Sequence, residues 1–215
     1  SINFPESIKF IGDYAFAWSR LTSVVIPEGV ETIGEVAFVE CDNLKTVTIP
    51  KSVTNIAMGA FSYNASLTSI TVDSENLNYL SENGILFNKE KTTLIQYPGA
   101  KQGAYTIPES VTKIGYAAFS NCWGLTYINI HNNVTSIENE AFYRCQNLNN
   151  VIIPESITVI EDNSFAACFN MKWVKIPSSV NEIRDYSFIE CGLTEIICLN
   201  PEPPLLNDCT PCIFE

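Results

Sequence analysis

Cysteine is the residue type in this chain with the most reactive side chain, because a thiolate can act as a nucleophile, form a disulfide or bind a metal. Five of the eight cysteines stand three residues after a phenylalanine: Cys41, Cys122, Cys145, Cys168 and Cys191. If these positions stack, neighbouring thiols lie roughly 5 Å apart, within reach of a disulfide or a metal ladder. Ser19 and Asn64 take the same place elsewhere. A position that accepts Cys, Ser or Asn is typical of a small buried turn residue, so we expect free buried thiols.

The other three cysteines lie near the end of the sequence. Cys209-Thr-Pro-Cys212 has the spacing of a redox or zinc half-site, and Cys198 is close by. A zinc site needs a further Cys or His pair, whereas the chain has a single histidine, and a thioredoxin-like motif needs a βαβ setting. A disulfide among these three cysteines, or a dithiol enzyme based on Cys209 and Cys212, remain the alternatives.

Acid and base catalysis finds little support in the sequence. His131 occupies a position that holds proline in other repeats, which indicates a turn residue, and a histidine-based triad has no second histidine to draw on. Glu28, Glu109 and Glu155 each follow a proline, and this regularity indicates a solvated turn edge instead of a pair with separated pKa values. We therefore predict no catalytic residue, no metal, no cofactor and no enzymatic activity.

Composition narrows the class of partner. The chain carries 12 Lys+Arg against 24 Asp+Glu, and its net charge of -12 opposes binding to nucleic acid or anionic lipid. The 46% of hydrophobic residues is enough for a continuous core. No apolar run approaches the roughly 20 residues that span a bilayer. The sequence opens at Ser1 without a basic, apolar leader, so we expect a cytosolic protein or one whose leader was removed.

A repeat of 22 or 23 residues organises the chain. Its most regular column is aromatic and comprises Phe16, Phe38, Phe61, Phe119, Phe142, Phe165 and Phe188. Aliphatic residues alternate before each proline, as in Val24-x-Ile26 and Val151-x-Ile153, which is the period of a half-buried strand. Periods of this length are typical of solenoids. One repeat cannot bury its apolar side chains alone, because ordering costs about 1.5 kcal/mol per residue, so the repeats must stack.

Two segments depart from the repeat. The interval from Asp73 to Pro108 is 35 residues, and its extra residues 83–105 contain β-rich pieces around the polar turn 88–91, which predicts a hairpin-like insertion. This insertion could border a binding face, or its apolar residues could rejoin the core. Residues 199–215 form an irregular, partial C-terminal repeat. We expect one solenoid of about eight repeats over residues 1–215.

The repeat pattern L-x-x-V-x-I-P-x-x-V-x-x-I-G-x-x-A-F-x-x-C resembles the BspA-like class of leucine-rich repeat over essentially the whole chain. The resemblance implies a right-handed, curved, β-rich solenoid of short parallel strands, with turns and short 3-10 or helical segments. Proteins of that class are mostly bacterial surface or secreted proteins. The resemblance therefore implies an extracellular or cell-surface location after export, with a lipid anchor upstream of this chain as one way of attachment, and a role in adhesion or ligand capture.

The outward strand residues are the remaining candidates for a site, and those of the later repeats are unusually apolar. We predict that the partner-binding residues are Tyr127, Asn129, Asn150, Ile152, Trp173, Lys175 and Glu195. Exposed aromatic residues beside Asn and Lys suit protein hot spots or sugar stacking. The sequence thus favours a non-enzymatic module that presents a ladder of strand side chains to an extracellular protein or glycan. The alternative is a structural spacer or scaffold that displays another domain.

Overall fold

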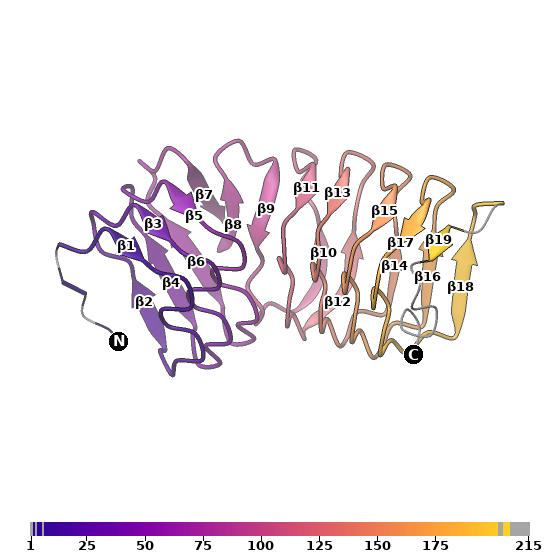
Figure 1. Cartoon of the computed structure of the whole chain (residues 1–215), viewed down its shortest axis with the longest axis horizontal. Coiled ribbons are helices and arrows are strands. Elements are labelled where there is room, and N and C mark those ends of the chain that lie inside the picture. The colour runs from indigo at the N-terminus through magenta and orange to yellow at the C-terminus, as the bar shows by residue number, and fades with distance from the viewer. Residues whose placement is uncertain (1, 3, 6, 202–203, 207–215) are drawn as a thin grey trace.

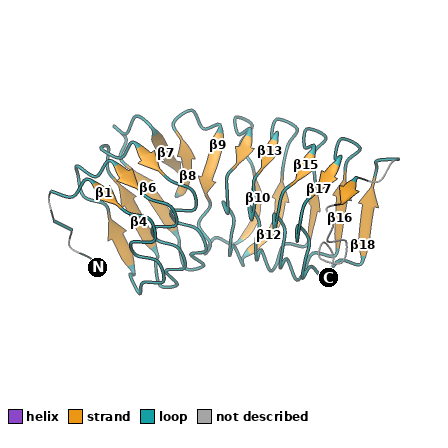
Figure 2. Ribbon diagram, viewed as in Figure 1, coloured by secondary structure: helices purple, strands orange, loops and turns teal. Residues whose placement is uncertain are grey.

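The chain winds into a solenoid built from β-strands and turns. The computed structural model describes residues 2, 4–5, 7–201 and 204–206. No helix occurs within these residues, and Figure 2 shows only strands and loops from one end of the stack to the other. Each coil contributes one strand to each of two ladders that run along the long axis (Figure 1). No described helix could cross a membrane.

The first ladder contains the strands that precede the proline positions of the repeat, and they form three parallel sheets, β2-β4-β6, β10-β12 and β14-β16-β18. They are β2 (Ser23–Val25), β4 (Thr46–Ile49), β6 (Ser69–Val72), β10 (Gly103–Thr106), β12 (Leu125–Asn129), β14 (Asn150–Ile152), β16 (Trp173–Ile176) and β18 (Glu195–Cys198). Pairing follows the repeat, so that Val24 is opposite Val47 and Val47 is opposite Ile70. The alternation in the sequence therefore sends one set of side chains into the core and the other outward.

The second ladder is made of two-residue strands that each include the aliphatic residue six places after the proline slot. They are β1 (Phe10–Ile11), β3 (Thr32–Ile33), β5 (Asn55–Ile56), β11 (Lys113–Ile114), β13 (Ser136–Ile137), β15 (Val159–Ile160), β17 (Glu182–Ile183) and β19 (Leu205–Leu206). These strands also pair in parallel at the repeat spacing, as Ile114 with Ile137 shows. The core lies between the two ladders.

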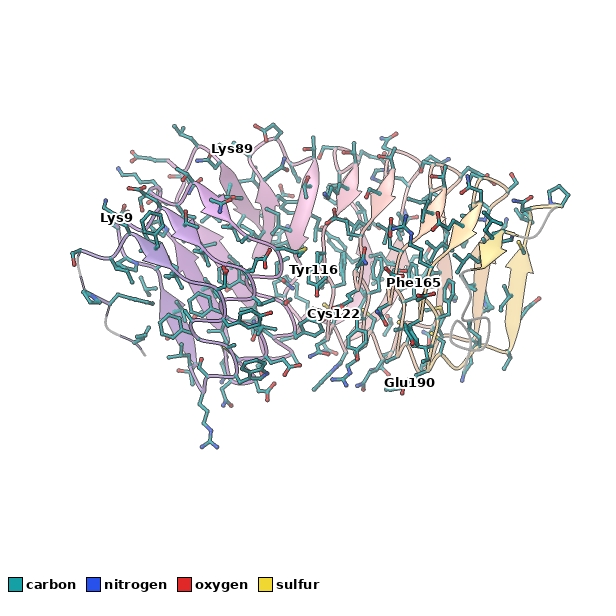
Figure 3. The ribbon with its side chains drawn as sticks, in the orientation of Figure 1. Lys9, Lys89, Tyr116, Cys122, Phe165 and Glu190 are labelled. Carbon is teal, nitrogen blue, oxygen red and sulfur yellow. The ribbon has the colours of Figure 1, made fainter. Side chains whose placement is uncertain are left out.

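The phenylalanine column forms a continuous file inside each half of the stack, as the sequence predicts. Phe142 is fully buried, and its ring centroid lies 4.9 Å from that of Phe119 and 5.1 Å from that of Phe165 (Figure 3 labels Phe165). The rings are nearly parallel, at 15° and 4°. Burial of each such side chain contributes about 1.5–3 kcal/mol, which a single coil cannot obtain by itself. The predicted solenoid is confirmed.

The short 3-10 or helical segments that the resemblance implies are absent from the described residues, and this expectation is wrong. The residues two places before and two places after the phenylalanine adopt left-handed backbone angles, such as Glu140 (φ 59°) and Arg144 (φ 57°) around Phe142. Alternate N–H groups then bond to the next coil, as Phe142 N–H does to Ser164 O at 2.7 Å. A helix needs consecutive right-handed residues, so this alternation prevents one. We call this segment the phenylalanine turn.

The extra residues before Pro108 form an antiparallel sheet that lies within the stack. Its strands are β7 (Tyr79–Glu82), β8 (Ile85–Asn88) and β9 (Thr93–Gln96), and β9 pairs in parallel with β11. Side chains of β8 alternate: Leu86 packs in a cluster with Val24 to Ile70, while Ile85 and Phe87 pack with the later coils. Strand β8 therefore divides the core into an N-terminal and a C-terminal cluster.

Candidate functional site

All seven residues predicted to bind a partner lie on one face of the first ladder, over the C-terminal core cluster. Asn150 is opposite Trp173, and Trp173 is opposite Glu195; Ile152 is likewise opposite Lys175. Tyr127 and Asn129 on β12 are joined to β14 through the bond from Asn149 N–H to Thr126 O, at 3.2 Å. We call this surface the ladder face.

The ladder face combines apolar and polar side chains. Tyr127 is 43% exposed and Ile152 50%, whereas Trp173 and Lys175 are half-buried. The column that contains Tyr127 and Trp173 has small polar residues in the N-terminal coils, namely Ser23, Thr46 and Ser69. In this column the apolar side chains therefore lie in the later coils, where they are available for contact with a partner.

The local sequence explains why these side chains are held rigidly. Val151 and Val174 are buried on the inner side of β14 and β16, and they lie opposite each other in the ladder. Because side chains of a strand alternate, burial of these valines fixes their neighbours on the outer side. The outward residues are not needed for the core and can therefore serve recognition.

Two exposed aromatic residues near this face were not predicted from the sequence. Trp123 and Phe169 occupy the position directly after the column cysteine, and each is 46% exposed. Asn147 Nδ2 donates to Trp123 O at 2.7 Å, which ties the backbone at Trp123 to the next coil. The signal that could have revealed them is the sequence column itself, because its other members are small or polar: Arg20, Asp42, Ala65, Gln146 and Gly192. They add aromatic surface beside the start of β12 and β16.

A cleft of about 510 Å³ opens beside β10, next to the ladder face. Its floor includes Phe87, Tyr97 and Tyr105, and its rim includes Glu82 and Lys101. Burial raises the pKa of Tyr97 to about 12 and also raises the pKa of Tyr105, so both phenols stay neutral at ordinary pH. We call this feature the β10 cleft.

The cysteine column consists of thiols without disulfides, as expected. Cys41, Cys122, Cys145 and Cys168 are free and buried, and Cys191 is free and half-buried (Figure 3 labels Cys122). Each thiol donates to the carbonyl oxygen of an aromatic residue one coil earlier, for example Cys145 Sγ to Phe119 O at 3.1 Å. Burial raises the pKa of Cys145, which keeps this thiol protonated and unreactive.

Asn64 shows what the cysteine position does. Its Nδ2 donates to Phe38 O at 2.8 Å and to Phe61 O at 2.9 Å, and its Oδ1 accepts the N–H of Cys41 at 2.7 Å. The position therefore supplies a donor to the carbonyls of the phenylalanine turn. Cys198 is free and exposed, whereas Cys209 and Cys212 lie outside the described residues, as does most of the irregular segment 199–215.

His131 and the nearby acidic residues take structural roles. One ring nitrogen of His131, Nε2, lies 2.9 Å from Pro108 O, and the other, Nδ1, accepts the N–H of Asn133 at 3.2 Å. The contact with Pro108 holds the turn against the previous coil, and the contact with Asn133 lies within the turn itself. Tyr116 donates its hydroxyl to Glu140 at 2.9 Å, and burial raises the pKa of that carboxyl group. Among the described residues no group of three or more His, Cys, Asp or Glu side chains could hold a metal ion.

Comparison with solved structures identifies the same architecture in bacterial leucine-rich repeat proteins. A leucine-rich repeat protein from Eubacterium ventriosum matches with a TM-score of 0.79 and 30% identity over 89% of this chain, which spans 58% of that protein. A leucine rich cell surface protein from Faecalibacterium prausnitzii matches with a TM-score of 0.62 and 25% identity, over 89% of this chain and 70% of the other. The pneumococcal vaccine antigen PcpA shares the fold, with a TM-score of 0.68 and 23% identity over 91% of this chain and 61% of that protein.

Sequence comparisons give a consistent result. No curated protein matches the chain. The family model described as the BspA type leucine rich repeat region matches residues 1–101 and 96–202, in six copies. These two matches cover nearly the whole sequence and follow the stacked coils seen in the structure. The chain therefore belongs to the BspA-type leucine-rich repeat family.

Proposed function

We propose that this chain is a non-enzymatic binding module that presents the ladder face to an extracellular protein or glycan. The observation that carries the proposal is the concentration of outward apolar residues, Tyr127, Ile152 and Trp173, on three successive coils. They are accompanied by Asn150 and Lys175, which can orient a ligand through hydrogen bonds and charge. Aromatic side chains with polar neighbours are the usual anchors of protein interfaces.

The architecture supports such a role because the surface exists before a partner arrives. Beneath the ladder face, β14, β16 and β18 are paired to one another, and β12 is linked to β14 by the bond from Asn149 N–H to Thr126 O; the inner residues Ile128, Val151 and Val174 are buried. Little conformational entropy is then lost by this protein on binding, which improves affinity for a given contact area. The chemistry of the chain supports a non-enzymatic role, since four of the five column thiols are buried and His131 is held by backbone contacts.

Export to the cell surface or the medium is part of the proposal. It is supported by the family and by the Faecalibacterium prausnitzii relative, which is described as a cell surface protein. The net charge of -12 disfavours nucleic acid as the partner. The chain spans 58% of the Eubacterium ventriosum protein, so the proposal concerns this module and the ladder face that it carries.

The test is a double substitution, Tyr127→Ala with Trp173→Ala, in a screen against extracellular-matrix proteins and glycans. Removing two interface anchors is expected to weaken binding of a captured partner by at least about tenfold. The control is Thr46→Ala with Ser69→Ala, which changes the same column in the N-terminal coils and should leave binding within about twofold. Thermal melts confirm that both variants fold.

The competing function is a spacer that only displays another domain. It predicts that the wild-type module captures none of the screened proteins or glycans, or that the Tyr127 and Trp173 double variant captures them as well as the wild type does. Either result would refute the ladder face as a binding surface. A partner that both double variants lose equally would also contradict the proposal, since it would place the contact elsewhere.

A further inference from the structure

The first ladder is interrupted between β6 and β10, although these strands are consecutive in that ladder. The sheet that begins with β2 and β4 ends at β6, and β10 pairs with β12 alone. The β10 cleft lies along the unpaired side of β10, where Ala104 and Thr106 line it. Strand β10 is therefore an edge strand in the interior of the solenoid.

The backbone of β10 offers hydrogen-bonding groups to this cleft. Gly103 N–H donates to Gly124 O at 2.8 Å, and Ile107 N–H donates to Asn129 O at 3.1 Å, so these groups point toward β12. Successive N–H groups of a strand point to opposite edges. The N–H and C=O groups of Ala104 and Thr106 consequently point toward the cleft.

The facing edge of β6 is closed by the inserted segment. Ile70 N–H donates to Gly84 O at 2.9 Å, and Val72 N–H donates to Ser81 Oγ at 3.0 Å. Gly84 has φ 79°, and a Cβ atom at this position would lie 2.8 Å from Ser69 Cβ, so only glycine permits this close approach. The edge of β6 is thus capped, whereas the edge of β10 remains available for pairing with another strand.

The cleft also provides what the side chains of a ladder strand require. In the regular coils the inward residues of a strand contact apolar side chains of the next coil, and the floor of the cleft is formed by Ile85, Phe87 and Tyr105. Its rim is polar, with Glu82 and Lys101. A strand with apolar residues facing inward and polar residues facing outward would match both surfaces.

We propose that the β10 cleft binds an extended peptide segment with alternating apolar and polar residues, which adds to the edge of β10 as a strand. The peptide lies along the unpaired side of β10: its backbone pairs with Ala104 and Thr106, and its apolar side chains rest on the cleft floor. This site is separate from the ladder face, so the two can be tested independently.

The probe is a fluorescein-labelled peptide, KTVTIP, which copies residues 45–50 and hence a strand of this ladder. Its valine and isoleucine correspond to the buried residues Val47 and Ile49. Fluorescence anisotropy with the full chain should show saturable binding. A control peptide with the changes Val47→Asn and Ile49→Asn should bind at least about tenfold more weakly, since it cannot use the floor.

The protein variant Thr106→Pro removes an N–H group that points into the cleft without removing a bond to β12. We expect it to weaken KTVTIP binding by about tenfold or more, through the lost hydrogen bond and the intruding ring. Val25→Pro is the matched control, because Val25 also lies on an edge strand two residues before a proline. It should change binding by less than about twofold, and melts should show that both variants fold.

Three results would overturn the proposal. The first is the absence of KTVTIP binding at millimolar protein, and the second is equal binding by the wild type and Thr106→Pro. The third is a homodimer of the wild type that Thr106→Pro dissociates, because a second copy of the chain would then occupy the edge. Peptide binding that survives Tyr127→Ala with Trp173→Ala is expected, and it distinguishes this site from the ladder face.

Discussion

The substitution Phe142→Ala should be among the most destabilising single changes in the solenoid. Phe142 is fully buried between two rings whose centroids lie 4.9 and 5.1 Å away. Its N–H is bonded to the next coil at 2.7 Å, so the backbone is held in place and the space left by the ring cannot close easily. Phe→Ala changes at such sites cost about 3–5 kcal/mol. We expect a loss of this size in the free energy of unfolding of the C-terminal coils.

Urea unfolding followed by tryptophan fluorescence can measure this loss in the correct half of the molecule. Trp18 reports on the N-terminal coils, and Trp123 and Trp173 report on the C-terminal coils. A variant that keeps only Trp18, or only Trp123 and Trp173, therefore shows the unfolding transition of one half of the stack. The comparison is Phe16→Ala, since Phe16 lies near the start of the stack and is only half-buried. Its cost should be about 1–2 kcal/mol. Equal costs for the two variants would refute the idea that the file of rings is a cooperative core.

Three further predictions concern the phenylalanine turn. At Glu190 (φ 56°) the Gly variant should be at least about 1 kcal/mol more stable than the Val variant, and at the strand residue Thr48 the Val variant should be the more stable. Urea unfolding measures both differences, and a preference for the same residue at both sites would contradict the prediction. Asn64→Ala should lower the free energy of unfolding by about 2–4 kcal/mol, because three buried backbone groups lose their hydrogen-bond partner. Asn64→Cys should lose less stability, since a thiol can donate one of these bonds. Equal melting temperatures for the two variants would count against the shared role of the position. Burial raises the pKa of Glu140 above its usual 4.5, so the folded protein binds this proton more tightly than the unfolded chain does. This contribution to stability should be present below pH 4.5 and should be lost as the pH rises through the raised pKa; in Glu140→Gln melts that part of the pH dependence should disappear.

The sequence was sufficient to predict the repeating elements because each coil uses the same apolar columns. Val24, Val47 and Ile70 occupy one column, and the structure places them opposite one another on successive strands. The thiol positions were also predictable, since the presence of Asn64 among cysteines indicates a buried donor instead of a reactive group. The same alternation predicts which strand residues face outward, and the structure places them on one face. It carries no information about the partner that they bind.

The conformation of the phenylalanine turn could not be predicted in the same way. Left-handed residues are normally signalled by Gly or Asn, as at Gly59 and Asn121, yet most of the equivalent positions hold other residues, such as Tyr14, Glu40 and Arg144. These conformations are stabilised by bonds between coils, as Tyr14 N–H to Glu35 O at 3.0 Å shows. Such bonds form only in the assembled stack, so the local sequence carries no direct sign of them. Short helical segments were therefore a reasonable but wrong expectation from the resemblance.

The inserted strands show why the site beside β10 was likewise hidden in the sequence. Tyr79 accepts the N–H of Ile56 at 2.8 Å, and Gly84 accepts that of Ile70, so the insertion closes the open edges of both ladders on the N-terminal side. An unprotected strand edge invites pairing with another chain, and proteins usually cover it. Here the inserted segment covers β5 and β6, and its strand β9 pairs with β11, while β10 faces a cleft with an apolar floor. This asymmetry is hard to explain by stability alone, because a cap on β10 would add hydrogen bonds and bury Tyr105. It is the arrangement expected if the edge of β10 is kept available for a strand supplied by a partner.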